Sequence, residues 1–279
     1  MLTEAQKGQY AKDGYLVLPG FKSPAEIAAL RQRAAQIVDA FDPADSVSIF
    51  TTQEQEKTTD DYFLGSADKI RCFFEEEAFG ADGALRQDKS LSINKIGHAL
   101  HDIDPVFIAF SRDDKLAAVA EDIGLADAQV WQSMYIFKQP GIGGEVRWHQ
   151  DATYFDSTPI SVTTFWFALE DATLENGCLW VEPGGHRGPL RERFIREGDA
   201  VRVETLDAMP WPDDSTAIPV EVAAGSLVCF HGLLPHYSAP NRSPVSRHAY
   251  TLHATDGRTA YSAGNWIQRG AELPVRGFR

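Results

Sequence analysis

The segment Arg147-Trp148-His149-Gln150-Asp151 places an imidazole and a carboxylate two residues apart. In an extended chain the side chains of residues i and i+2 lie on one face, so His149 and Asp151 are expected to point to one place. Two imidazoles and one carboxylate form the ligand set that holds Fe(II) and leaves coordination positions open. Because a His-x-Asp pair is by itself more often a surface or core feature, the metal interpretation depends on the surrounding sequence.

From about residue 130 onward, the residue composition and spacing are typical of a β protein. Apolar runs are short, rich in β-branched and aromatic residues, and separated by Gly or Pro. Short, evenly spaced strands favour a sandwich or barrel over alternating βα units. The expected strands are Val130–Phe137, Val146–Gln150, Ser161–Ala168, Cys178–Val181, Val201–Glu204, Ile218–Val222, Ser226–Phe230 and Arg247–Ala254.

The first 125 residues are expected to be mainly helical. Ser23 as N-cap and Pro24 at the first helical position, followed by apolar residues at helical spacing, predict a helix to Ala40. Residues 42–66 are polar and aperiodic, which is typical of a lid or binding loop. The acidic residues 73–77 are expected to face solvent. The other expected elements are a helix over 3–13, a strand over 15–18, a helical region over 90–101 and a helix over 113–123.

Composition limits the classes of function. The 279 residues are 43% hydrophobic and carry a formal charge of −14, from 40 acidic and 26 basic residues. This balance argues against nucleic acid as the main partner, because such binding depends on Lys and Arg that neutralise phosphates. It also argues against binding to an anionic membrane surface, and no apolar run has the length of a membrane span. We interpret the charge as favouring solubility and expect a single globular domain.

The cysteines indicate the compartment. Cys72, Cys178 and Cys229 are odd in number, far apart and without CxxC spacing, so neither a disulfide framework nor a zinc ribbon is expected. The N-terminus has no basic region followed by an apolar run, which argues against a signal peptide. We therefore expect reduced core thiols in a cytoplasmic protein.

Among the remaining histidines, His236 is favoured as the third ligand. It follows a glycine-containing loop and lies beside the polar Ser238 and Asn241. His231 ends an apolar strand, so it is better interpreted as a core histidine or a hydrogen-bond partner of a ligand. His186 lies in a Pro-Gly-Gly turn, where a hydrogen-bonding role is expected.

Arg247 suggests an anion in the same place. Strand alternation puts Arg247, Ala249, Thr251 and His253 on one face. A guanidinium directed into a β cavity is costly unless it meets an anion, and it binds a carboxylate through two parallel hydrogen bonds. The alternative is a structural arginine paired with an internal Asp or Glu.

These residues and several longer motifs resemble Fe(II)/2-oxoglutarate-dependent oxygenases, and more narrowly the phytanoyl-CoA dioxygenase family with its domain-containing members. The resemblance runs from the N-terminal helix nearly to the C-terminus. Its motifs are residues 94–100, 137–140, 143–146, 149–152, 170–180, 183–186, 265–266 and 271–274.

The resemblance implies a double-stranded β-helix (jelly roll) over 126–279, buttressed by helices and lid segments of 1–125. It implies Fe(II) held by His149, Asp151 and His236. It further implies 2-oxoglutarate and O2 as co-substrates, with ascorbate as a further candidate cofactor. Arg247 and Ser238 match the positions that bind the distal carboxylate. The residues matching other positions that line the 2-oxoglutarate pocket are Lys95, Met134 and Trp166.

Two other interpretations stay open. One is a cupin-like jelly roll that binds metal without oxygenase turnover and acts as an isomerase or ligand sensor. The other is a structural helix-plus-sandwich protein with accidental histidines. Arg247 discriminates the oxygenase from the first of these, because a cupin without 2-oxoglutarate has no need of this arginine. The family name suggests a fatty acyl-CoA substrate, but the chain has no basic cluster for the phosphates of coenzyme A, so other small metabolites are equally compatible.

Overall fold

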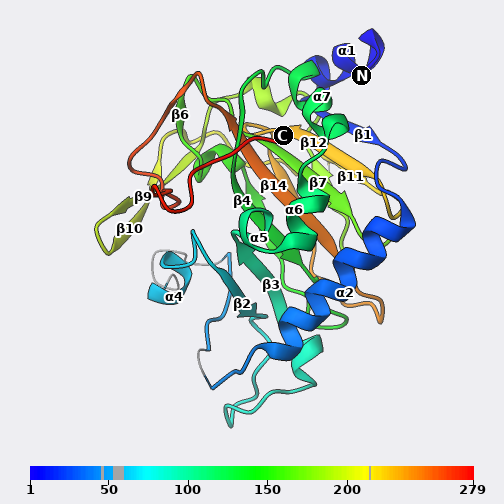
Figure 1. Ribbon diagram of the computed structural model, residues 1–279, viewed down its shortest axis with the longest axis vertical. Coiled ribbons are helices and arrows are strands. Elements are labelled where there is room, and N and C mark those ends of the chain that lie inside the picture. Colours follow the sequence, from blue (N-terminus) through cyan, green and yellow to red (C-terminus); the bar gives the residue numbers. More distant parts are fainter. Residues whose placement is uncertain (45–46, 53–59, 214) are drawn as a thin grey trace.

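Two antiparallel sheets form the framework of the computed structural model, which describes residues 1–44, 47–52, 60–213 and 215–279 (Figure 1). The large sheet has seven strands in the order β1-β12-β7-β14-β4-β3-β2. In that order they are Tyr15–Leu18, Leu227–His231, Thr163–Ala168, Ala249–Asp256, Ala128–Ile136, Ile93–His98 and Ile70–Phe74. The small sheet has the order β11-β8-β13-β5, formed by Ile218–Val220, Leu179–Val181, His236–Ser238 and Val146–His149.

Alternation along β7 explains how the large sheet packs on both faces. Phe165 and Phe167 belong to the core on the helical side, whereas Trp166 and Ala168 belong to the core that faces the small sheet. The second core includes Val181 of the small sheet. All six residues of β7 are buried, as expected for a central strand between two layers.

Helices cover the outer face of the large sheet. Figure 1 shows α2, α5 and α6 in front of it. The longest, α2, is capped as predicted: Ser23 accepts from the Glu26 amide, Glu26 accepts from the Ser23 amide, and Pro24 starts the helix. The helices are α1 Glu4–Asp13, α2 Pro24–Ala40, α4 Asp61–Leu64, α5 Leu100–Ile103, α6 Pro105–Ser111 and α7 Asp114–Asp122.

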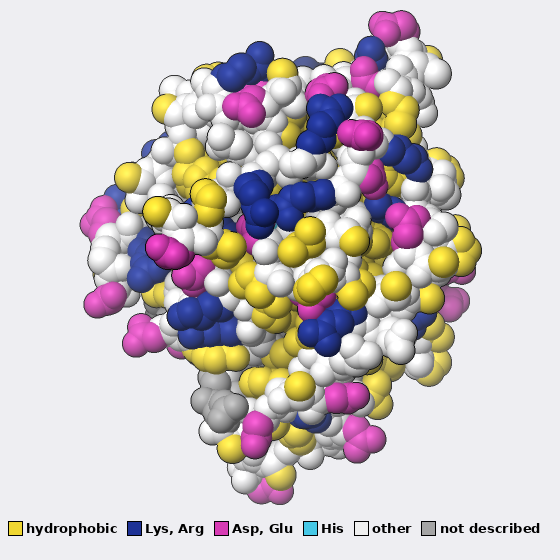
Figure 2. All heavy atoms as spheres, viewed as in Figure 1, with side chains coloured by type: hydrophobic (Ala, Val, Ile, Leu, Met, Phe, Trp, Pro, Cys, Tyr) yellow, Lys and Arg dark blue, Asp and Glu magenta, His cyan; other side chains and the backbone are white. Residues whose placement is uncertain are grey.

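Short elements complete the fold. Two further antiparallel pairs are the hairpin of β9 Glu192–Glu197 with β10 Ala200–Thr205, and the pairing of β6 Ser157–Thr158 with the distant β15 Ala260–Tyr261. The described residues also form the 3₁₀ turns η1 Lys89–Leu91, η2 Asp151–Thr153 and η3 Gly185–Arg187. On the helical face, basic and acidic side chains are interspersed with hydrophobic ones (Figure 2). None of the helices in the described part of the chain has the length and hydropathy to cross a bilayer. The three cysteines are free and buried.

The prediction of a helical region over 90–101 is wrong. Residues Ile93–His98 form β3, which pairs with β2 and β4; the α-helix α5 begins only at Leu100, and the 3₁₀ turn η1 covers the first residues of the region. Ile93, Ile96 and Gly97 explain the difference, because β-branched residues and glycine disfavour a helix and tertiary pairing then decides. Together with β1 and β2, this strand brings three strands from the first 125 residues into the large sheet.

The prediction of a solvated acidic face over 73–77 is also wrong for its first half. Phe73, Phe74 and Glu75 are fully buried, the first two as the end of β2. The Glu75 carboxylate accepts from Asn94 Nδ2 at 2.7 Å and from the Gly144 amide at 3.1 Å, which offsets the cost of burying it. The predicted lid over 42–66 lies partly outside the described residues; within them it contains α4.

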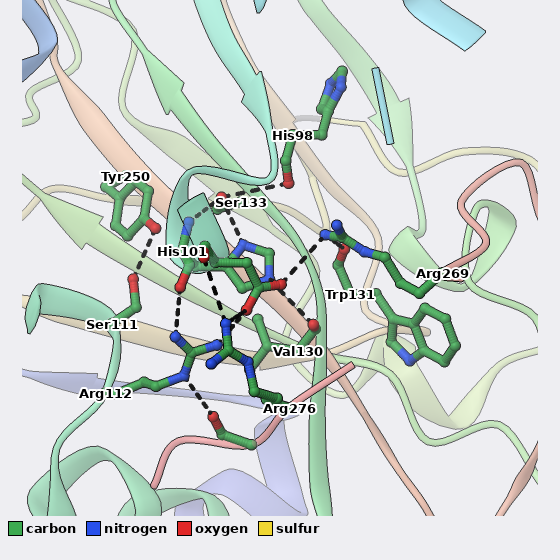
Figure 3. A network of polar contacts seen from close by, with 12 residues as sticks. His98, His101, Ser111, Arg112, Val130, Trp131, Ser133, Tyr250, Arg269 and Arg276 are labelled. Carbon is green, nitrogen blue, oxygen red and sulfur yellow. Dashed lines mark hydrogen bonds and ion pairs between the residues drawn. The ribbon is translucent and has the colours of Figure 1, made fainter. Parts of the chain in front are cut away.

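A buried ionic cluster around Asp102 fastens the C-terminal segment to α5 (Figure 3). Asp102 Oδ1 accepts from Arg112 and, at 3.2 Å, from Arg276, while Arg269 Nη2 lies 3.7 Å and His101 Nε2 lies 3.1 Å from Oδ2. Burial alone would raise the pKa of Asp102, but the hydrogen bonds and charges of His101 and Arg112 hold that pKa well below its usual value. Arg269 also donates to the Trp131 carbonyl at 2.8 Å, so the segment is tied to β4 as well.

Candidate functional site

A cavity of about 140 Å³ lies between the two sheets. Residues from β3, β4 and β14 of the large sheet and from β5 and β13 of the small sheet line it. The eight residues singled out in the sequence all line this cavity, and they are Lys95, Met134, His149, Asp151, Trp166, His236, Ser238 and Arg247.

Three potential metal ligands converge at one end of the cavity. His149 ends β5, Asp151 opens η2 two residues later, and His236 begins β13, where it is paired with His149. Their ligand atoms lie within 4.8 Å of one another. The Nε2 atoms of His149 and His236 are 3.6 Å and 3.7 Å from Asp151 Oδ1. The geometry is that of three donors directed at one point.

Backbone carbonyls fix the tautomer of both imidazoles. His149 Nδ1 lies 2.8 Å from the Arg147 carbonyl, and His236 Nδ1 lies 3.0 Å from the Leu234 carbonyl. A carbonyl only accepts, so each Nδ1 carries the hydrogen and each Nε2 presents a lone pair toward Asp151. Burial, together with His149, lowers the pKa of His236 to about 4, which keeps that ring neutral at physiological pH.

The second oxygen of Asp151 is held by groups that sequence analysis did not assign to the site. Thr164 of β7 donates a hydrogen bond to Oδ2, and His253 Nε2 of β14 lies 3.6 Å from the same atom. Burial would raise the pKa of Asp151, but the charges of His236 and His253 hold it well below its usual value. Oδ1 is therefore the oxygen that faces the two Nε2 atoms. The alternation of residues 247–253 was the available signal for His253, and its placement beside Arg247 on one face is confirmed.

Arg247 lines the same cavity and has no ion pair with a carboxylate among the described residues. Its guanidinium is buried, its Nε donates to the Gly177 carbonyl at 3.1 Å, and its Nη1 has no hydrogen-bond partner in the described part of the chain. The Trp166 ring centroid is 5.4 Å from Cζ. Burial lowers the pKa of Arg247 to about 10, so the group stays cationic at neutral pH. The alternative of a structural arginine paired with an internal acid therefore finds no support.

A second buried basic residue, Lys138, lies next to Arg247, whose amide donates to the Lys138 carbonyl. Lys138 is 2% exposed, and its Nζ donates to the Gly144 carbonyl at 2.7 Å and to Ser238 Oγ at 2.7 Å. Burial, with the charge of Arg247, lowers its pKa well below the usual value for lysine. The sequence offered no signal for this residue beyond its place in a family motif, because one lysine after a strand is ordinarily solvated.

Lys95 is buried on β3 and not solvated as lysines ordinarily are. Its Nζ lies 3.6 Å from Met134 Sδ and over the ring of Phe50, at 2.9 Å from the centroid. Burial lowers the pKa of Lys95 well below its usual value. An anion or a polar ligand in the cavity would meet this group directly.

The outer wall of the cavity is aromatic and was not predicted. Trp266 stacks on Phe63 with a centroid distance of 4.6 Å, and both contact the ring of His98. His98 Nδ1 lies 2.7 Å from Ser66 Oγ, while Nε2 has no partner within the described ranges. Figure 3 shows the His98 ring pointing away from His101, while the His98 carbonyl accepts a hydrogen bond from Ser133 Oγ at 3.4 Å. His231, expected to be a core histidine, is not among the cavity residues and lies against His186.

Comparisons with known proteins agree with this geometry. The family model for phytanoyl-CoA dioxygenase matches residues 10–249. Phytanoyl-CoA dioxygenase of Arabidopsis thaliana is 47% identical over 98% of this chain and 95% of its own length. Phytanoyl-CoA dioxygenase domain-containing protein 1 of Bos taurus is 44% identical over 98% of this chain and 97% of its own.

Solved structures share the fold. A non-heme alpha ketoglutarate dependent carbocyclase from nogalamycin biosynthesis superposes with a TM-score of 0.67 at 20% identity, covering 99% of this chain and 96% of that one. EctD from S. alaskensis gives a TM-score of 0.64 at 22% identity, covering 99% and 84%. With two facing antiparallel sheets in this chain, these likenesses confirm the predicted jelly roll with helical additions.

Proposed function

This chain belongs to the phytanoyl-CoA dioxygenase family, and on that premise we propose that it is an Fe(II)- and 2-oxoglutarate-dependent dioxygenase that hydroxylates a small organic molecule. One observation carries the proposal. Three convergent ligand atoms and a buried guanidinium without a carboxylate partner among the described residues line the same cavity. The first feature suits a metal, and the second suits the carboxylate of a co-substrate.

The donor set fits Fe(II). His149 and His236 offer Nε2 atoms, because each Nδ1 is turned to a backbone carbonyl, and Asp151 offers Oδ1 of an ionised carboxylate. A metal held by two imidazoles and one carboxylate would keep open positions for co-substrate and O2. Thr164 occupies Oδ2 and so favours coordination through a single oxygen. A filled Asp151 position also favours hydroxylation over halogenation, which needs that position for a halide.

The inner end of the cavity fits 2-oxoglutarate. Arg247 and Ser238 would bind its distal carboxylate, with Trp166 against its carbon chain. Met134 and Lys95 would form the other wall, where Lys95 supplies a donor to an oxygen of the ligand. When bound, iron and 2-oxoglutarate supply the oxidising chemistry, in which O2 converts the 2-oxo acid to succinate and CO2 and one oxygen atom enters the substrate. Ascorbate is the proposed auxiliary reductant.

The residues of the chain would orient the reactants and exclude water. The aromatic wall of Phe63 and Trp266 gives the substrate side an apolar surface, with His98 as a polar group among the rings. Such a wall suits a compact, mostly apolar small molecule. We also propose a cytoplasmic location, which the three free buried thiols support.

The test is turnover of 2-oxoglutarate by the purified protein with Fe(II) and O2, measured as succinate and CO2. We expect slow release without added substrate, faster release with a matching metabolite, and none from an Asp151→Ala variant. A cupin-like isomerase or sensor would bind the metal and release no succinate under any condition. Absence of both metal binding and succinate would refute the proposal.

A further inference from the structure

Lys138 is a buried ammonium that neither a prediction nor a comparison assigns to the site. We infer that Lys138 is a positioning residue for 2-oxoglutarate: it directs the hydroxyl hydrogen of Ser238 toward the distal carboxylate and adds a second positive charge beside Arg247. The inference rests on the proposed function and names a further determinant of co-substrate selection.

The hydrogen bonds of Lys138 account for all its hydrogens. Nζ contacts the Gly144 carbonyl at 2.7 Å, Ser238 Oγ at 2.7 Å and the Ser238 carbonyl at 3.3 Å. Three oxygens match the three hydrogens of an ammonium, which donates to each of them, whereas a neutral amine has two hydrogens for the two carbonyls and would accept the third contact from the Ser238 hydroxyl. The geometry therefore fits the charged form, although burial disfavours it.

The consequence for Ser238 follows from donor and acceptor roles. An ammonium only donates, so Ser238 Oγ accepts from Lys138 and keeps its own hydrogen for another acceptor. No described residue accepts that hydrogen, and the side chain lines the cavity. A carboxylate oxygen placed against Arg247 is an acceptor of the required kind. The Ser238 hydroxyl could otherwise either donate or accept, and Lys138 thus fixes it as a hydrogen-bond donor to the ligand.

The two cations are neighbours through the backbone as well as in the cavity. The Arg247 amide donates to the Lys138 carbonyl at 3.3 Å. Gly177, whose carbonyl accepts from Arg247 Nε, leaves room for the lysine: a Cβ at this position would lie 2.8 Å from Lys138 Cε. The same glycine has φ +83, so it serves both the turn and the passage of the lysine side chain.

The charges at this end of the cavity do not balance. Glu75 is the buried anion that acts on both Lys138 and Arg247, and its carboxylate is already held by Asn94 and the Gly144 amide. Lys138 and Arg247 share one fully buried acid, because Glu145, which also acts on Lys138, is exposed, and Glu170, which also acts on Arg247, is paired with Arg31. A buried charge without compensation is costly. One carboxylate at this end restores neutrality. A 2-oxo acid without a distal carboxylate does not, so the pair selects for a dicarboxylate.

The test is calorimetric titration under anaerobic conditions of Fe(II)-loaded wild type and Lys138→Met with two ligands, 2-oxoglutarate and 2-oxopentanoate. Removing one charge-assisted interaction is expected to weaken 2-oxoglutarate binding about 10- to 100-fold. The binding of 2-oxopentanoate, which lacks the second carboxylate, should change little. Fe(II) affinity should be unchanged, since no metal ligand contacts Lys138 in the described structure.

Two further variants give the test its specificity. In a Ser238→Ala background the effect of Lys138→Met should shrink, because part of it acts through the hydroxyl. Lys22→Met is the matched control: Lys22 is also buried, it pairs with Asp113 at 2.6 Å, and it does not line the cavity, so 2-oxoglutarate affinity should be retained. If Lys138→Met does not fold, Lys138→Gln provides the same comparison with a donor kept and the charge removed.

The outcomes separate this inference from the proposed function. Wild type that does not bind 2-oxoglutarate overturns both. Wild type that binds it, with a variant of equal affinity or with equal weakening of both 2-oxo acids, overturns the role of Lys138 alone. Selective weakening of the dicarboxylate supports it.

Discussion

The Asp102 cluster allows a quantitative prediction for Asp102→Asn. This change keeps the shape of the side chain and removes its charge. Arg269 is then the residue most affected, because its side chain is 1% exposed and Asp102 is the acid with which it pairs. Arg112 is 13% exposed and Arg276 is 49% exposed, so water compensates increasingly for those two. The variant leaves one guanidinium buried without a counter-charge.

The magnitude follows from that burial. Removing one partner of a buried ion pair costs about 3–5 kcal/mol, because the remaining charge is left uncompensated. For a chain of this size each kcal/mol lowers Tm by about 2–4 °C, so a decrease of about 6–20 °C is expected. The stabilisation by Asp102 also has a pH dependence: it is present above the unfolded pKa of about 3.9 and is lost as pH falls toward the lower folded value.

The assay is urea denaturation and thermal unfolding at neutral pH, with Glu77→Gln as the matched control. Glu77 pairs with Arg242 at 2.5 Å, but the two side chains are 42% and 56% exposed, so the control should cost less than about 1 kcal/mol. A loss below about 1 kcal/mol for Asp102→Asn, equal to that of the control, would refute the interpretation of the cluster as an anchor of the C-terminal segment.

The remaining predictions concern the site and its response to pH. His149→Ala and Asp151→Ala should each abolish stoichiometric Fe(II) binding in an anaerobic titration, because each removes one of three ligands; retained binding would contradict the assignment. Arg247→Gln should weaken 2-oxoglutarate binding by about 100-fold and leave Fe(II) affinity in place, and normal 2-oxoglutarate affinity would count against it. Burial and the nearby His186 lower the pKa of His231 to about 4 in the folded chain. As pH falls, the unfolded chain therefore protonates this histidine at a higher pH than the folded chain does. Stability should fall as pH decreases from about 6.5 toward about 4, and His231→Gln should reduce that slope in denaturation curves; an unchanged slope would exclude His231 as its source.

Local patterns explain why the centre of the site could be predicted. His149 and Asp151 are two residues apart in and just after one strand. Arg247 lies two residues before β14 and in phase with His253 within it, so both pairings follow from strand periodicity. The long helix α2 was equally predictable, because its N-cap and its apolar spacing are local. The proposed third ligand, His236, came from resemblance and loop context, and its pairing with His149 is a property of the sheet.

Tertiary placement explains what was missed. Lys138, Thr164 and Trp266 reach the cavity from separate segments, and neither periodicity nor composition distinguishes them from core or surface residues. The strand β3 was mistaken for helix because its six residues are buried almost throughout and lack clear alternation. Glu75 was assigned to solvent because a buried carboxylate is rare unless several donors meet it, and those donors come from distant parts of the chain.

A single titration tests the central claim most directly. Anaerobic protein is titrated with Fe(II) and then with 2-oxoglutarate, and the same titrations are repeated on a His236→Ala variant. We expect one Fe(II) per chain and tight 2-oxoglutarate binding only after the metal is present, with both lost in the variant. Unchanged Fe(II) affinity in the His236→Ala variant, or equal 2-oxoglutarate affinity with and without Fe(II), would contradict the account.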